Sequence, residues 1–256
     1  MMGLADALAA MLTNEDDLAL LRRDPTALRD RFALTENELA MLAGAGPAGY
    51  RVTRRNVQAK LRRAIGGCLP VTVAHLHRHH PDLWERFASG LVRPPQPVHR
   101  HGIWESERLT DWLTARDLAP VADYARYELE RAKLRRADHD RTGRDPADVL
   151  GPGTGTGTDR PLTLSSDVRI LMFDHDVTAG PPLADLPVRR THVVLHRPSP
   201  SSHLQTYRVS PGTALLLAGC DGTRTTQQLV ACAASDPAAV RTALDRLMAA
   251  DLVRPA

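Results

Sequence analysis

Hydrophobic residues recur at helical spacing through the first part of the chain. They lie three or four residues apart, as Leu39 and Leu42 do, and this spacing places them on one face of a helix. Helix starts are marked too, because Thr35 and Glu38 have the spacing of a capping box. Residues 3–43 are therefore predicted to form short amphipathic helices.

Residues 46–137 continue the helical pattern. This block begins with a strongly basic stretch at 51–63 that also carries an apolar stripe, and its last helix is predicted from about Pro120 through Ala137. We therefore expect two all-α parts, a small helical segment at 1–45 and a helical domain at 46–137.

The composition changes at 138–160, where Gly, Thr and Asp dominate and almost nothing can be buried. Such a segment is typical of a flexible linker. Beyond it the helical period gives way to β-rich runs, at 168–177, 191–197 and 204–210. Three helices are predicted after these runs, and 252–255 is compatible with a short final strand.

This order of elements predicts an α+β fold. N-terminal all-α helical domains precede a C-terminal winged-helix-like domain at 161–256, with a three-stranded sheet plus three helices.

The composition is that of a globular protein, with 43% apolar and 25% charged residues in 256. A formal net charge of +3 is too small to indicate nucleic acid by itself. The three cysteines, Cys68, Cys220 and Cys232, form no C-x-x-C pair, so neither a disulfide framework nor a thiolate metal site is expected. No basic leader and no apolar run of about 18 residues is present, so we expect a cytoplasmic protein that does not enter the membrane.

Histidines gather at 75–80, with His99 and His101 nearby. On a helix His75 and His79 share a face, but no carboxylate stands at H-E-x-x-H spacing, so a solvated or partner-facing surface is favoured over a metal site. The run GPGTGTGTD at 151–159 lacks the G-K-[ST] ending of a phosphate-binding loop. No G-x-S-x-G motif is present, and no catalytic residue is assigned.

The C-terminal half has the outline of a strand, an apolar helix, a D-G-x-x-T turn, a short helix and a longer helix that ends in an L-V pair. These parts are Thr206 to Val209, Ala214 to Leu217, Asp221 to Thr225, Gln227 to Ala231 and Val240 to Val253. This outline resembles the PqqD-like peptide-recognition elements of ribosomal-peptide biosynthesis. DNA-binding winged helices share much of it, so a winged-helix transcriptional regulator is the alternative.

The middle of the chain extends the resemblance. The runs PVTVAHLHRHHPDLWERFASGLVRPPQP, WESERLTDWL and PVADYARYELERAKLR, followed by the strand Leu164 to Leu171, are similar to the partner subunits of multinuclear non-haem iron oxidases in methanobactin-type pathways. In that family the iron and the oxidative chemistry on peptide cysteines belong to the other subunit. The resemblance implies a non-catalytic chain without its own cofactor, in a heterodimer with the oxidase. It also implies a precursor peptide, and not nucleic acid, as ligand.

The N-terminal segment lies outside that match. Its pattern LLRRDPTALRDRFALTENELAMLAG resembles the small helical LigA-type domain found beside ring-cleaving dioxygenases. This likeness suggests an additional docking module.

Strand addition is the binding mode that the resemblance implies, because an open sheet edge offers unpaired N–H and C=O groups to an extended peptide. If the strand at 205–209 is that edge, the last helix forms the other wall of the groove. The same apolar stripe of that helix can instead pack on the chain's own sheet. The predicted peptide-binding residues are Gln205, Thr206, Tyr207, Arg208, Val209, Val240, Arg241, Ala243, Leu244, Leu247 and Met248.

Overall fold

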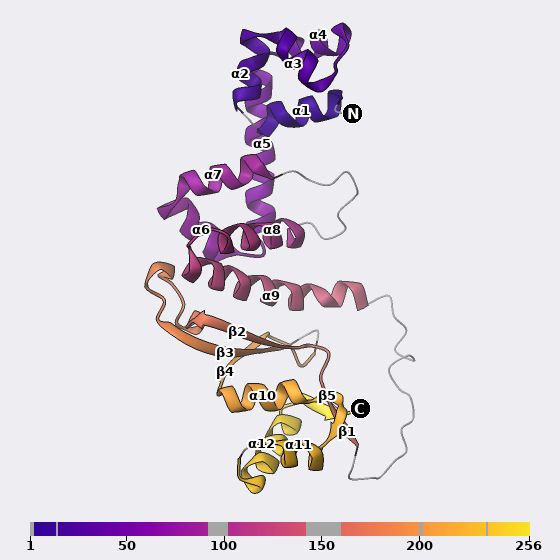
Figure 1. Cartoon of the computed structure of the whole chain (residues 1–256), viewed down its shortest axis with the longest axis vertical. Coiled ribbons are helices and arrows are strands. Elements are labelled where there is room, and N and C mark those ends of the chain that lie inside the picture. Colours follow the sequence, from indigo (N-terminus) through magenta and orange to yellow (C-terminus); the bar gives the residue numbers. More distant parts are fainter. Residues whose placement is uncertain (1–2, 14, 92–101, 142–159, 200–201, 234) are drawn as a thin grey trace. The chain divides into compact units, whose positions relative to one another are not determined.

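The computed structural model describes residues 3–13, 15–91, 102–141, 160–199, 202–233 and 235–256 (Figure 1). It divides into two compact units, Met1–Ala115 and Arg116–Ala256. We refer to them as the helical unit and the sheet unit. The runs at 93–97 and 151–159, together with His99 and His101, lie outside the described residues.

The helical unit contains eight helices within the described residues. They are α1 (Leu4–Thr13), α2 (Glu15–Arg23), α3 (Pro25–Phe32), α4 (Glu36–Gly44), α5 (Gly46–Gly66), α6 (Pro70–His79), α7 (Pro81–Gly90) and α8 (Ile103–Thr114).

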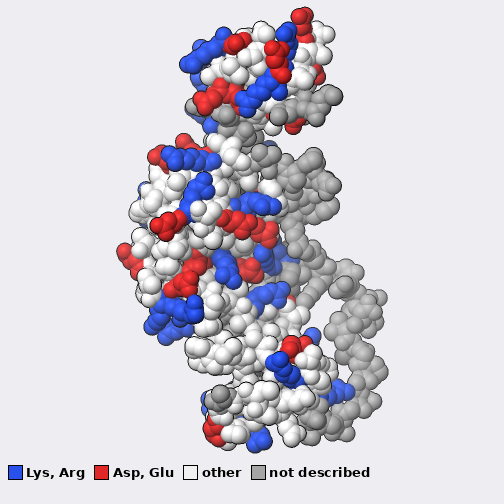
Figure 2. All heavy atoms as spheres, viewed as in Figure 1, with Lys and Arg blue, Asp and Glu red and all other residues white. Residues whose placement is uncertain are grey.

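A first core joins α1–α4 to the start of α5. Met11, Leu28 and Phe32 are buried in it, and the Tyr50 hydroxyl donates a 2.8 Å hydrogen bond to the carbonyl of Leu42. The predicted capping box of α4 is confirmed, since the Thr35 side chain accepts from the Glu38 N–H and the Glu38 side chain accepts from the Thr35 N–H. Figure 2 shows acidic and basic side chains intermixed on the visible face of these helices.

The remaining helices of this unit pack around the second half of α5, which contacts α6 and α8. Gly102 starts α8 with φ +89°, and a Cβ built there would lie 2.6 Å from the carbonyl oxygen of Ala64. Its N–H donates a 2.7 Å hydrogen bond to the buried Glu105 carboxylate. Only glycine fits this junction, because the backbone angle and the close approach both exclude a side chain.

The sheet unit begins with a long helix and continues with strands and shorter helices. Its elements are α9 (Ala119–Arg141), β1 (Pro161–Leu164), β2 (Val168–His175), the 3₁₀ turns η2 (Val177–Ala179) and η3 (Leu183–Asp185), β3 (Val188–His196), β4 (Gln205–Val209), α10 (Pro211–Gly219), β5 (Asp221–Thr225), α11 (Thr226–Cys232), α12 (Pro237–Ala249) and β6 (Val253–Pro255).

Two antiparallel three-stranded sheets form from these strands, in the orders β2-β3-β4 and β5-β1-β6. One core of buried residues unites them with α10–α12. It includes Val194 of the larger sheet, Leu162 and Val253 of the smaller sheet, and Leu217 and Leu244 of the helices. The larger sheet has helices on both faces, with α9 on one and α10 on the other (Figure 1).

Helix α9 differs from its predicted placement. The sequence assigned residues up to 137 to the helical domain, but α9 packs on β2 and on both 3₁₀ turns of the sheet unit. The Tyr127 ring meets Phe173 of β2 edge to face, at 6.3 Å between ring centroids. The helix also continues to Arg141, into the segment predicted as linker, and 142–159 lies outside the described residues.

The predicted α+β fold, with helices first and sheet after, is confirmed. The predicted strand at the C-terminus exists as β6. The smaller sheet as a whole was not predicted, and the D-G-x-x-T run interpreted as a turn is in fact strand β5. The likeness to a winged helix stays a prediction.

No helix of the described residues has the length and apolar character needed to cross a membrane. All three cysteines are free: Cys68 and Cys220 are buried, and Cys232 is exposed.

Candidate peptide-binding edge

Strand β4 is an edge of the larger sheet. Within the described residues it pairs with β3 alone, with Gln205 opposite His196 and Val209 opposite His192. An edge strand leaves the N–H and C=O groups of alternate residues unpaired, and these groups can bind an added strand. Strand β4 therefore has the pairing that peptide capture requires.

One face of β4 looks toward the core of α10–α12. Tyr207 lies opposite Val194, a member of that core, and residues directly opposite in an antiparallel pair point to the same face. Val209 packs against the same core. Tyr207 nevertheless remains 37% exposed, and its hydroxyl donates a hydrogen bond to the Gln205 side chain. This face presents an accessible aromatic ring at the sheet edge.

Helix α9 contacts the opposite face of β4 at Thr206. Thr206 lies opposite the buried Leu195, and its hydroxyl is 3.4 Å from both the Tyr127 hydroxyl and Nη1 of Arg131. Arg131 also donates a hydrogen bond to the Tyr127 hydroxyl, and its guanidinium lies 5.1 Å from the centroid of that ring. Helix α9, which lies far before β4 in the sequence, thus brings the cation of Arg131 to this edge strand.

Arg208, on the same face as Thr206, is held by the buried Asp176. The Arg208 Nη1 donates a 3.2 Å hydrogen bond to Asp176 Oδ2, and Arg189 of β3 donates another to the same oxygen. Burial alone would raise the pKa of Asp176, but hydrogen bonds from Thr178 and Arg189 outweigh it and lower the pKa below its usual value. Asp176 is therefore a carboxylate that two arginines share.

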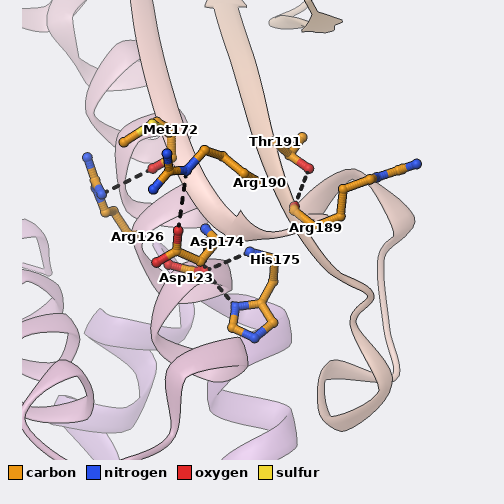
Figure 3. A network of polar contacts seen from close by, with 8 residues as sticks. All are labelled: Asp123, Arg126, Met172, Asp174, His175, Arg189, Arg190 and Thr191. Carbon is orange, nitrogen blue, oxygen red and sulfur yellow. Dashed lines mark hydrogen bonds and ion pairs between the residues drawn. The ribbon is translucent and has the colours of Figure 1, made fainter. Parts of the chain in front are cut away.

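A second carboxylate fastens α9 to the end of β2 (Figure 3). Asp123 Oδ2 accepts hydrogen bonds of 3.1 Å from the N–H groups of Asp174 and His175, and it lies 2.8 Å from His175 Nδ1. Arg126, one turn further along α9, donates to the carbonyl oxygen of Met172 at 3.4 Å. These bonds fix which side of α9 meets the sheet.

Helix α12, which was predicted to form the second wall of the groove, turns its apolar residues into the core. Val240, Leu244 and Leu247 of α12 are buried, with 7%, 0% and 9% of their surface exposed, and they belong to the core of the sheet unit. Met248 is partly buried against that core, Ala243 is half-buried and Arg241 is exposed. The apolar stripe of α12 contacts the chain's own residues.

The structure thus brings the five predicted residues of β4 together at an edge, while it places the apolar residues of α12 in the core. Sequence reasoning missed Tyr127, Arg131 and Asp176. Tyr127 and Arg131 are four residues apart, a spacing that puts both on one helix face. No sequence signal connected that face to β4, which lies more than seventy residues away.

No protein-family model matches the chain, and no curated protein sequence matches it. The resemblances drawn from the sequence motifs remain predictions.

The histidines of α6 lie close together and close to His80, the residue that follows the helix. The His75 ring centroid is 4.7 Å from that of His79 and 5.6 Å from that of His80. Burial lowers the pKa of His75, and the nearby His79 and His80 lower it further. Within the described residues, no group of three or more His, Cys, Asp or Glu side chains could hold a metal ion.

Proposed function

We propose that this chain binds an extended segment of a ribosomally made precursor peptide along β4, and delivers the peptide's core to an iron-dependent oxidase. The observation that carries the proposal is the pairing of β4, which is hydrogen-bonded to a neighbouring strand on one side only within the described residues. In this proposal the chain is a non-catalytic partner subunit.

The surroundings of β4 support peptide capture. Main-chain hydrogen bonds to an edge strand give affinity for any extended segment, whereas side chains on the two faces select among sequences. Here Tyr207 supplies an exposed aromatic surface on one face, and Arg208 supplies a cation on the other. Strand β4 is held by its pairing with β3, in a sheet that carries α9 on one face and α10 on the other, so little ordering of the binding strand is needed.

The oxidase partner rests on the sequence resemblance. In that family the metal and the cysteine chemistry belong to the second subunit, so this chain would supply recognition alone. The expected complex is a heterodimer that holds the precursor peptide.

The test combines co-purification with a binding assay. The probe is the product of a short Cys-containing reading frame encoded beside this chain and an oxidase, labelled for fluorescence anisotropy. We expect both the peptide and the oxidase to be retained. We also expect slower hydrogen exchange in β4 when the peptide is bound, because strand addition protects its outward N–H groups.

A matched pair of variants locates the binding surface. Tyr207→Asp places a charge in the proposed contact and should weaken peptide binding by about tenfold or more, as loss of an aromatic contact does in interfaces. Met41→Asp places the same charge at another exposed apolar residue, in α4, and should leave binding within about twofold.

Unchanged exchange in β4, together with equal affinity of the two variants, would contradict the proposal. Retention of an operator DNA duplex in place of the peptide would favour the winged-helix regulator instead.

A further inference from the structure

We infer that the segment captured by β4 is an acidic one, with carboxylates at two alternate positions on the α9 face and an apolar residue between them on the Tyr207 face. This inference rests on the proposed function and names the class of peptide that its site selects. The juxtaposition that carries it is Arg131 of α9 and Arg208 of β4 on one face of the same edge strand.

Among the residues that the structure describes, Arg131 forms no ion pair with a carboxylate. Its hydrogen-bond partners among the described residues are the hydroxyls of Tyr127 and Thr206, and both are neutral. Arg131 is partly buried, and its guanidinium lies 5.1 Å from the centroid of the Tyr127 ring whose hydroxyl it binds, so its position is fixed before any ligand binds. A positioned cation without a carboxylate has donors left for an incoming anion.

Arg208 is also incompletely neutralised. It shares the single Asp176 carboxylate with Arg189, so two positive charges meet one negative charge. The Arg208 side chain is 56% exposed although Asp176 is buried, which leaves part of its guanidinium open to a further partner. The cluster around Asp176 therefore carries one more positive than negative charge.

The spacing of the two cations matches the repeat of a strand. Arg131 contacts the side chain of Thr206, and Arg208 is the next residue of β4 on the same face, about 6.6 Å further along. Alternate residues of an added strand repeat at the same distance, and directly opposite side chains have Cβ atoms about 5 Å apart. Carboxylates at i and i+2 of the peptide therefore face Arg131 and Arg208 in register.

The intervening peptide residue points to the other face, where it meets Tyr207. That side chain is 37% exposed beside the apolar core of α10–α12, and few charged side chains surround these helices on the face visible in Figure 2. An apolar or aromatic residue fits this position. The expected pattern is acidic, apolar, acidic.

The experiment selects peptides without assuming their sequence. A displayed library of randomised dodecapeptides is panned on the immobilised full-length chain, and the selected pool is sequenced. We expect Asp or Glu to be enriched at i and i+2, with an apolar residue at i+1. Synthetic copies of the selected peptides, with Glu and with Gln at the two positions, then serve as probes for fluorescence anisotropy.

Variants of the chain connect the pattern to the two arginines. Arg131→Ala and Arg208→Ala should each weaken binding of the Glu peptide about three- to tenfold, with little effect on the Gln peptide. Arg131→Lys should recover part of the loss because it restores charge without the planar fork. Arg190→Ala removes an exposed arginine of β3 and should leave both affinities within about twofold.

The outcomes distinguish failure of this inference from failure of the proposed function on which it rests. If selected peptides slow hydrogen exchange in β4 but carry no acidic pattern, or bind Arg131→Ala as tightly as the wild type, the inference is wrong and strand addition stands. If no selected peptide protects β4 and Tyr207→Asp binds the pool normally, both are wrong.

Discussion

Replacing Asp176 by Asn should destabilise the sheet unit selectively at neutral pH. The Asp176 side chain is 5% exposed and accepts hydrogen bonds from Thr178 and from two arginines. Asparagine keeps the shape but removes the charge, and its amide group donates where an arginine also donates. The perturbation therefore removes the charge-assisted bonds while leaving the packing almost unchanged.

The size of the expected loss in stability depends on how exposed the two arginine partners of Asp176 are. A hydrogen bond to a charged group contributes about 1.5–3 kcal/mol when it is well enclosed. Arg189 and Arg208 have side chains 57% and 56% exposed and can be rehydrated, which reduces the contribution to about 1 kcal/mol each. We expect a loss of about 2 kcal/mol in the free energy of unfolding, or about thirtyfold faster exchange of β2–β4 amides through opening of the unit.

The assay has an internal control. All three tryptophans, Trp84, Trp104 and Trp112, lie in the helical unit, so tryptophan fluorescence during urea unfolding reports on that unit alone. Its midpoint should not change in the Asp176→Asn variant. Hydrogen exchange of peptides from β2–β4 should show the loss in the sheet unit.

The pH dependence gives the sign of the effect. Because the pKa of Asp176 is lowered in the folded chain, its contribution is complete above the unfolded value of about 3.9 and is lost as pH falls through the folded value. The difference between wild type and Asp176→Asn should be full at pH 7 and should narrow as pH falls below the unfolded value and through the lowered folded pKa. Equal stability at pH 7, or a difference that persists in acid, would refute the reasoning.

Other perturbations test other parts of the fold. Gly102→Ala should lower the fluorescence-detected urea midpoint of the helical unit by the equivalent of about 3 kcal/mol or more. The reason is that backbone strain at φ +89° adds to a clash with the backbone of α5. An unchanged midpoint would contradict this. Leu244→Ala should destabilise the sheet unit by about 2–5 kcal/mol in exchange measurements, whereas Leu215→Ala, at a residue 74% exposed, should change it by less than about 0.5 kcal/mol. Thiol reagents followed by mass spectrometry should modify Cys232 well before Cys220, because Cys220 is buried and burial raises its pKa to about 11; equal rates would show that the sheet unit opens readily.

Local signals predicted much of the secondary structure. The capping box of Thr35 and Glu38 marked the start of α4, and the three predicted β-rich runs coincide with β2, β3 and β4. These features depend on residues close in sequence, such as a cap three residues from its partner or an alternation within one strand. Such patterns are the part of a fold that one sequence can reveal.

Strand β5 shows where local signals fail. Asp221 accepts a hydrogen bond from the Thr223 N–H and Gly222 has φ +85°, so the run carries real turn chemistry. It becomes a strand because β1, some sixty residues earlier, pairs with it. Pairing with a distant segment leaves no mark in the local sequence.

In the candidate site too, the local features could be predicted from the sequence and the contacts between distant segments could not. The sequence identified β4 through its alternation and through a motif outline, but it could not connect Arg131 or Asp176 to that strand. A helical period shows that α9 buries one face without showing what covers it. The apolar period of α12 was likewise compatible with a groove wall or a core, and the structure buries Leu244 completely.

The contacts that hold α9 on the sheet also determine which of its side chains reaches β4. Asp123 binds the end of β2, and Tyr127 meets Phe173 of the same strand, which together set the position of α9 along the sheet. One turn after Tyr127, Arg131 reaches Thr206 on the edge. An edge strand by itself offers main-chain groups that any extended peptide can use. In the proposed function, selectivity for an acidic segment depends on α9, so this helix is part of the proposed recognition surface.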